Sequence, residues 1–211
     1  MATSITGRGG NSRGRKQAEG GFSLIEVMIS MVVLTVGLVS LLGVFGLAMA
    51  ATQTSQQDMI AKQLANEALE SVVTARNTSQ ISWDDIQNVG STNCPITLAT
   101  TCGIFVGNPT TPTFEPIYNA GADGIFGTAD DSAAGEETLE VPGGDGIYGD
   151  SDDVKIPLTG YTRAIQLNQA TDANNNPIAS LRFINITVQY STTRAKLPKT
   201  YVLSSYISEY R

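Results

Sequence analysis

The first third of the sequence contains a long apolar run. It is followed by a segment whose apolar residues fall on one face of a helix. Residues 22–51 are almost entirely apolar, and this length suffices to cross a bilayer as a helix, since a span needs about 20 residues. Residues 52–76 contain neither Gly nor Pro and carry apolar positions at helical spacing, namely Ile60, Leu64, Ala68 and Val72, flanked by Ala61, Ala65, Leu69 and Val73. The pattern predicts one continuous helix whose first half needs apolar surroundings on all sides and whose second half packs on a domain by one face.

Alternating patterns of strand type appear towards the C-terminal end. Three runs, residues 161–168, 180–190 and 199–210, are rich in β-branched and aromatic residues. In the middle run every second position falls on one face, namely Arg182, Ile184, Ile186, Val188 and Tyr190. Turn-forming residues connect the runs, so residues 161–211 predict an antiparallel meander and, with the long helix, an α+β fold. Residues 77–160 show no such period and are expected to form irregular loops.

Charge is distributed unevenly along the 211 residues, whose formal net charge is −7. Residues 1–21 are rich in Gly, Ser and Arg and carry +3, so the rest of the chain carries −10. This composition predicts a disordered basic leader, and its charge places the amino end in the cytoplasm. An acidic body argues against nucleic-acid binding. Because the chain has no histidine and no nucleophile-and-base arrangement, we expect a protein that is not an enzyme.

Glu26 lies just inside the apolar run, where an ionised carboxylate is tolerated only with a partner or a function. No basic residue follows it between residues 27 and 51. The stretch around it reads Gly20-Gly21-Phe22-Ser23-Leu24-Ile25-Glu26. Together with the basic leader and the apolar helix, this G-F-S-L-I-E motif resembles the class III signal of the type IV pilin and pseudopilin superfamily. The resemblance is specific over about residues 16–50 and general elsewhere.

The resemblance implies a defined processing route and function. Prepilin peptidase is expected to cut after Gly21, which makes Phe22 the N-methylated first residue of the mature chain. The precursor is expected in the inner membrane, and the mature subunit in an extracellular filament of identical copies, built by the inner-membrane assembly machinery. Such fibres serve cell adhesion or motility, among other roles. The alternatives are a minor pilin or type II secretion pseudopilin and, from another class, a monomeric membrane-anchored calcium-binding module.

The position of Glu26 has a physical explanation in a stack of processed subunits. Its carboxylate is expected to neutralise the new ammonium group at Phe22 of a neighbouring copy and so to fix the axial register. The alternative is that Glu26 only favours the positive end of its own helix, an effect worth about 1 kcal/mol. That is less than the cost of immersing a charge in an apolar setting, so we favour the pairing.

Three glycines, Gly37, Gly43 and Gly46, mark weak points in the apolar half of the helix. Each costs about 1 kcal/mol relative to Ala inside a helix. They permit close contact between helices, local unwinding when the subunit leaves the membrane, or both.

An acidic pattern occurs twice between residues 121 and 154. The sequence D-G-I-[F/Y]-G-x-x-D-D begins at Asp123 and again at Asp145. Calcium prefers six to eight oxygen ligands, and glycine-rich turns can direct carbonyl and carboxylate oxygens inward. The predicted calcium ligands are Asp123, Asp130 and Asp131 in the first copy and Asp145, Asp150, Asp152 and Asp153 in the second. The spacing is not that of an EF-hand, and the alternative is a solvated acidic loop without metal.

Cys94 and Cys102 are the two cysteines of the chain and enclose a short loop. In an exported protein a disulfide is the favoured interpretation, with two free thiols as the alternative. Zinc is not expected, because the chain offers no histidine and no further cysteine.

The sequence thus divides into five predicted segments. They are a cleaved leader over residues 1–21, a membrane and polymerisation helix over 22–51, a packed helix over 52–76, a variable loop region over 77–160 and a sheet over 161–211.

Overall fold

The computed structural model describes residues 21–91, 102–191 and 198–210. It forms two compact units, residues 1–49 and 50–211, and each is described by itself. All of the predicted leader except Gly21 lies outside the described residues, and so does Cys94. The predicted pairing of Cys94 with Cys102 therefore stays a prediction. The described Cys102 is buried, with 3% of its surface exposed.

Helix α1 runs continuously from Leu24 to Asn77, as the sequence predicts. Its end is a defined motif rather than a fraying turn. Ser79 takes a left-handed conformation with φ of 59°, and the amides of Ser79 and Gln80 donate to the carbonyls of Arg76 and Ala75 at 3.1 and 3.0 Å. This is the Schellman arrangement, which usually places glycine at the left-handed position. A serine there costs about 1–2 kcal/mol relative to glycine.

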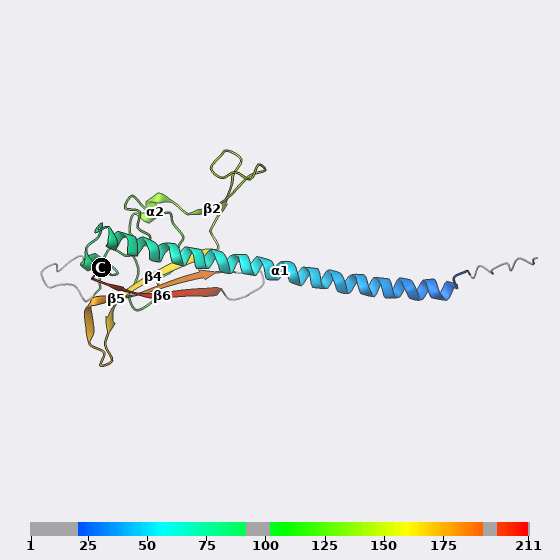
Figure 1. The fold of residues 1–211 in the computed structure, drawn as a ribbon, viewed down its shortest axis with the longest axis horizontal. Coiled ribbons are helices and arrows are strands. Elements are labelled where there is room, and N and C mark those ends of the chain that lie inside the picture. Colours follow the sequence, from blue (N-terminus) through cyan, green and yellow to red (C-terminus); the bar gives the residue numbers. More distant parts are fainter. Residues whose placement is uncertain (1–20, 92–101, 192–197, 211) are drawn as a thin grey trace, which may run out of the picture. The chain divides into compact units, whose positions relative to one another are not determined.

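A four-stranded antiparallel sheet forms the other layer of the second unit. Its strand order is β1-β4-β5-β6. The strands are β1 (Glu115–Pro116), β4 (Tyr161–Thr171), β5 (Pro177–Tyr190) and β6 (Lys199–Ser208). The predicted meander is confirmed, with Ile165 opposite Ile186 and Ile186 opposite Leu203. The second half of α1 runs alongside β4, β5 and β6 (Figure 1).

The core lies between one face of α1 and one face of the sheet. The helix buries Ala61, Leu64, Ala65, Ala68, Val72 and Ala75. Of the two alternating faces of β5, the one that carries Arg182, Ile184, Ile186, Val188 and Tyr190 is buried. Four of the six helical positions are alanines, whose small side chains let the helix backbone approach the sheet closely.

The region expected to be irregular, residues 77–160, contains more structure than the sequence predicts. Besides β1 it holds the short helices η1 (Trp83–Asp85) and α2 (Asp131–Ala134) and the strands β2 (Thr138–Val141) and β3 (Val154–Pro157). The predicted loop region therefore also contains short helices and strands. Strands β2 and β3 pair with each other as a separate antiparallel hairpin that extends away from the large sheet (Figure 1).

Candidate functional site

The N-terminal unit presents an apolar helix with no covering side chains among the described residues. Its apolar residues from Phe22 to Met49 are exposed, and Phe22 itself is 83% exposed. This helix is long and apolar enough to cross a membrane, which indicates a membrane anchor for the precursor. Glu26 lies in its first turn, where the amides of Glu26 and Val27 donate to the carbonyl of Ser23 at 3.0 and 3.3 Å.

The helical glycines lie on the open surface of this unit. A Cβ added at Gly37, Gly43 or Gly46 would meet no atom within 4 Å. Space within one subunit therefore does not explain why glycine stands at these positions. Close approach of another helix would explain it, because glycine lets two backbones come together.

The first acidic loop, residues 121–131, is docked into the core of the second unit. Ile125 is 1% exposed and belongs to the core cluster. The amide of Phe126 donates to the hydroxyl of Ser71 on α1 at 3.3 Å. Asp131, at 4% exposure, accepts hydrogen bonds from the amides of Gly121 and Gly127 at 3.0 and 2.6 Å. The loop is thus tied to the helix on one side and closed on itself by Asp131.

The second acidic loop, residues 143–153, repeats this conformation without the docking. The amide of Ile147 donates to Oδ1 of Asp145 at 2.9 Å, and the corresponding bond from Ile125 to Asp123 measures 2.8 Å. The amide of Gly149 donates to Oδ2 of Asp153 at 2.5 Å, as that of Gly127 does to Asp131. Ile147, however, is 61% exposed. Since packed and unpacked copies share one conformation, the motif itself determines the fold of the loop.

The first position of each loop lies directly against a carboxylate. A Cβ added at Gly121 would lie 2.2 Å from the carboxylate of Asp130, and one at Gly143 would lie 2.1 Å from that of Asp152. The repeated Gly124 and Gly146 take φ angles of 70° and 74°, a region that residues with a Cβ seldom adopt. The carboxylates therefore fold back over the glycine backbone.

Each loop brings three carboxyl groups together. Oxygen atoms of Asp123, Asp130 and Asp131 all lie within 4.8 Å of one another, and so do those of Asp145, Asp150 and Asp152. Asp153, which we also predicted as a ligand, is not part of the second group. Its carboxylate is turned to the amide of Gly149.

The pKa values of several of the clustered carboxyls are shifted by burial and by hydrogen bonds. Burial raises the pKa of Asp131, although backbone amides oppose the effect. The hydroxyl of Thr128 donates to Asp130 at 2.7 Å and lowers the pKa of that carboxyl. In the second loop, the hydrogen bond between Asp150 and Asp152 raises the pKa of Asp150 and lowers that of Asp152. Such sharing of a proton between carboxyls relieves repulsion when no cation is bound.

The residues present fit a calcium ion better than a transition metal. The clusters offer hard carboxylate oxygens and no imidazole or thiolate. Three aspartates supply fewer than the six to eight oxygens that calcium prefers, so backbone carbonyls and water would complete the shell. The first cluster is partly buried and the second is exposed.

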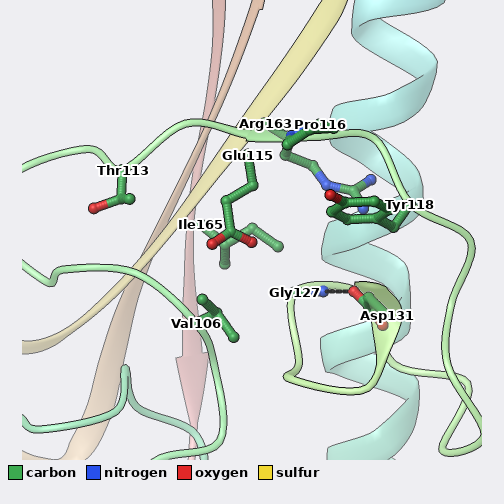
Figure 2. A pocket seen from close by; sticks show the side chains of 9 residues that line it. All are labelled: Val106, Thr113, Glu115, Pro116, Tyr118, Gly127, Asp131, Arg163 and Ile165. Atoms are coloured by element: carbon green, nitrogen blue, oxygen red, sulfur yellow. Dashed lines mark hydrogen bonds between the residues drawn. The ribbon is translucent and has the colours of Figure 1, made fainter. Parts of the chain in front are cut away.

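A third charged group was not predicted from the sequence. Arg163 on β4 is buried at 6% exposure, and it lines a small pocket with Glu115, Tyr118 and Asp131 (Figure 2). Its signal in the sequence is its place on the inward face of a strand, two residues before Ile165 and four before Leu167. A charged residue at such a position requires partners, since an unpaired buried charge is costly.

Comparison with known proteins gives one finding, and it concerns the N-terminal segment. Residues 16–42 match the family described as the prokaryotic N-terminal methylation motif. Neither the curated proteins nor the solved structures give a match. The matched segment contains Gly21, Phe22 and Glu26, so the motif coincides with the predicted processing and assembly positions.

Proposed function

We propose that this type IV pilin-like precursor, which is processed at its N terminus, matures into the structural subunit of an extracellular filament. The observation that carries the proposal is the exposed apolar segment from Phe22 to Met49, which is helical from Leu24 and has an acid in its first turn. Once the leader is removed, such a surface must be covered by lipid or by like helices, because exposed apolar surface of this extent is unfavourable in water.

Assembly pairs two charged groups, each of which is energetically costly in an apolar setting without a partner. Cleavage after Gly21 creates an ammonium group at Phe22, and Glu26 carries the opposite charge four residues further along the chain. In a bundle of helices, the carboxylate of one copy neutralises the amino terminus of the next. A mismatch in axial position leaves both charges unpaired in an apolar setting, so the pair selects one register.

The experiment that tests this function is electron microscopy of material sheared from the cell surface. We expect fibres that bind an antibody against this chain along their length. Labelling only at fibre tips, with low abundance, identifies a minor pilin instead. Loss of the chain from the sheared fraction, with short periplasmic fibres, identifies a type II secretion pseudopilin. Retention of the intact leader and a monomeric state contradict the filament proposal and leave a membrane-anchored module.

We also propose that calcium stabilises the acidic loops. The observation that favours this is the convergence of three carboxyl groups in each of two loops with one shared conformation. A divalent cation relieves their mutual repulsion, and it closes the first loop against the core that Ile125 enters. Extracellular calcium is about millimolar, so a site with a Kd of about 10⁻⁴ M is occupied.

Removal of calcium is expected to lower the melting temperature of the full chain in detergent. At a calcium concentration about 100 times Kd, binding stabilises the fold by about 2.7 kcal/mol, or roughly 5–10 °C for a domain of this size. Thermal unfolding with a chelator, and with excess calcium, measures the difference.

Substitutions in each acidic loop distinguish how much each loop contributes to the calcium effect on the melting temperature. Asp123→Asn combined with Asp130→Asn is expected to remove most of the calcium effect, because the first loop is part of the core. The matched pair Asp145→Asn and Asp152→Asn in the exposed loop should leave it largely intact. If a chelator leaves the melting temperature of the unmodified chain unchanged, residues 121–154 are solvated acidic loops without a metal.

A further inference from the structure

A buried arginine lies among more carboxyl groups than it can neutralise. Arg163 contributes one positive charge, and three acids on different elements attract it: Glu67 on α1, Asp131 on α2 and Glu137 just before β2. A fourth acid, Glu115 on β1, lines the same pocket as Arg163. Glu70, on the exposed side of α1, adds its charge to that of Glu67. The cluster therefore holds an excess of negative charge when all its carboxyls are ionised.

The arginine is held by contacts other than direct ion pairs. Its Nη1 donates to the carbonyl of Leu64 at 3.3 Å, and its guanidinium lies 4.7 Å from the ring centre of Phe126. Within the described part of the chain, the ion pairs closer than 4.0 Å join Lys155 to Glu140 and Lys199 to Asp58, both at the surface. Arg163 thus attracts the carboxyls around it without satisfying any of them by contact.

Glu137 is the least satisfied of these acids. Its Oε2 is buried and, in the described structure, accepts no hydrogen bond. A charged oxygen in this position is costly, while a protonated carboxyl avoids most of the cost. Burial raises the pKa of Glu137 to about 7, with a smaller contribution from Glu67, and the attraction of Arg163 opposes both. The pKa of Glu67 is raised as well, again chiefly by burial.

These groups connect the first acidic loop to the long helix. We call residues 117–137 the docked segment, because it contains the loop and α2 and is closed by a bond of 2.9 Å from the amide of Glu137 to the carbonyl of Ile117. Its contacts with α1 include the bond from Phe126 to Ser71, and Phe126 is also the ring beneath Arg163. Glu137 is the last residue of the docked segment, so a change in its charge affects the point where the segment is closed and lies near α1.

We propose that Glu67, Arg163 and Glu137 form a proton-operated latch. The packing of the docked segment on α1 is stable while one of the two glutamates is neutral. It is less stable when both glutamates are ionised. Between about pH 4.5 and pH 7 the folded state binds more protons at Glu137 than the unfolded state does, so the segment becomes less stable as the pH rises through this range. The effect is complete above about pH 7.

Hydrogen exchange of the full chain in detergent tests the latch, with a chelator present throughout so that bound cations do not contribute. Protection factors, which remove the intrinsic pH dependence of exchange, are measured for amides of the docked segment and of β5. From about pH 5 to pH 8 we expect protection in the docked segment to fall about tenfold or more, while β5 changes less.

Two variants and one control make the outcome specific. Glu137→Gln, which imitates the protonated side chain, is expected to keep high protection at both pH values, and Glu67→Gln should reduce the pH effect. Glu136→Gln, at the exposed neighbouring position, should behave as the unmodified chain. The proposal is overturned if the docked segment shows no pH dependence, or if Glu137→Gln retains the dependence of the unmodified chain.

Discussion

Replacing Glu26 by Gln is expected to reduce the amount of this chain in sheared surface fibres by roughly 100-fold or more. Removing one member of a buried ion pair costs about 3–5 kcal/mol, because the other charge stays in an apolar setting without a partner. The charge left behind is the amino terminus of Phe22 on the neighbouring subunit. Quantitative immunoblotting of the sheared fraction against the whole-cell amount measures the loss.

Membrane insertion and processing provide the internal reference for this experiment. The variant should still enter the membrane, because a neutral side chain at position 26 is cheaper in hydrocarbon than a carboxylate. Glu70→Gln makes the same chemical change at an exposed position in the second half of α1, the half that packs on the sheet. This variant should leave the fibre yield unaltered. Normal fibres from Glu26→Gln would show that the acid serves only its own helix.

Replacing Asp131 by Ala is expected to destabilise the second unit by about 2–3 kcal/mol in the presence of a chelator. The carboxylate of Asp131 accepts from the amides of Gly121 and Gly127 and from the hydroxyl of Thr128, the last at 3.3 Å. Its removal leaves the amides of Gly121 and Gly127 without their acceptor inside a loop that is part of the core, whereas the hydroxyl of Thr128 keeps Asp130 as its closer acceptor at 2.7 Å. Denaturation by urea measures the change as a shift of the midpoint at constant slope.

The chain supplies its own control for this effect. Asp153 occupies the corresponding position of the second acidic loop, where Ile147 is exposed and the carboxylate accepts from the amide of Gly149, so Asp153→Ala should cost about 1 kcal/mol or less. Equal losses in the two variants would mean that docking onto α1 and the core contributes nothing to the stability of the first loop.

The elements that the sequence predicts well are those with a long repeating pattern. Helix α1 and strands β4, β5 and β6 each repeat their spacing over ten residues or more. The elements that it misses, β1, β2, β3 and α2, have four residues or fewer, which is too short to show a period. Glu115 pairs with Arg163, a partner far along the chain, so no local pattern could reveal β1.

The candidate sites follow the same division. The acidic repeat allows the carboxyl groups of each loop to be predicted as neighbours, since local hydrogen bonds determine that fold. It does not predict that Ile125 is buried while Ile147 is exposed, because docking depends on the rest of the domain. The cluster of Glu67, Arg163 and Glu137 joins three distant segments and leaves only one trace in the sequence, a charge on the inward face of a strand.

The pairing of Glu26 with a neighbouring amino terminus is tested most directly by a density map of the native filament that resolves side chains. We predict a chain that begins at Phe22, with its nitrogen about 3 Å from a carboxylate oxygen of Glu26 in an adjacent subunit. A map in which every Glu26 faces away from neighbouring chain ends, or in which the leader is still attached, would contradict the account.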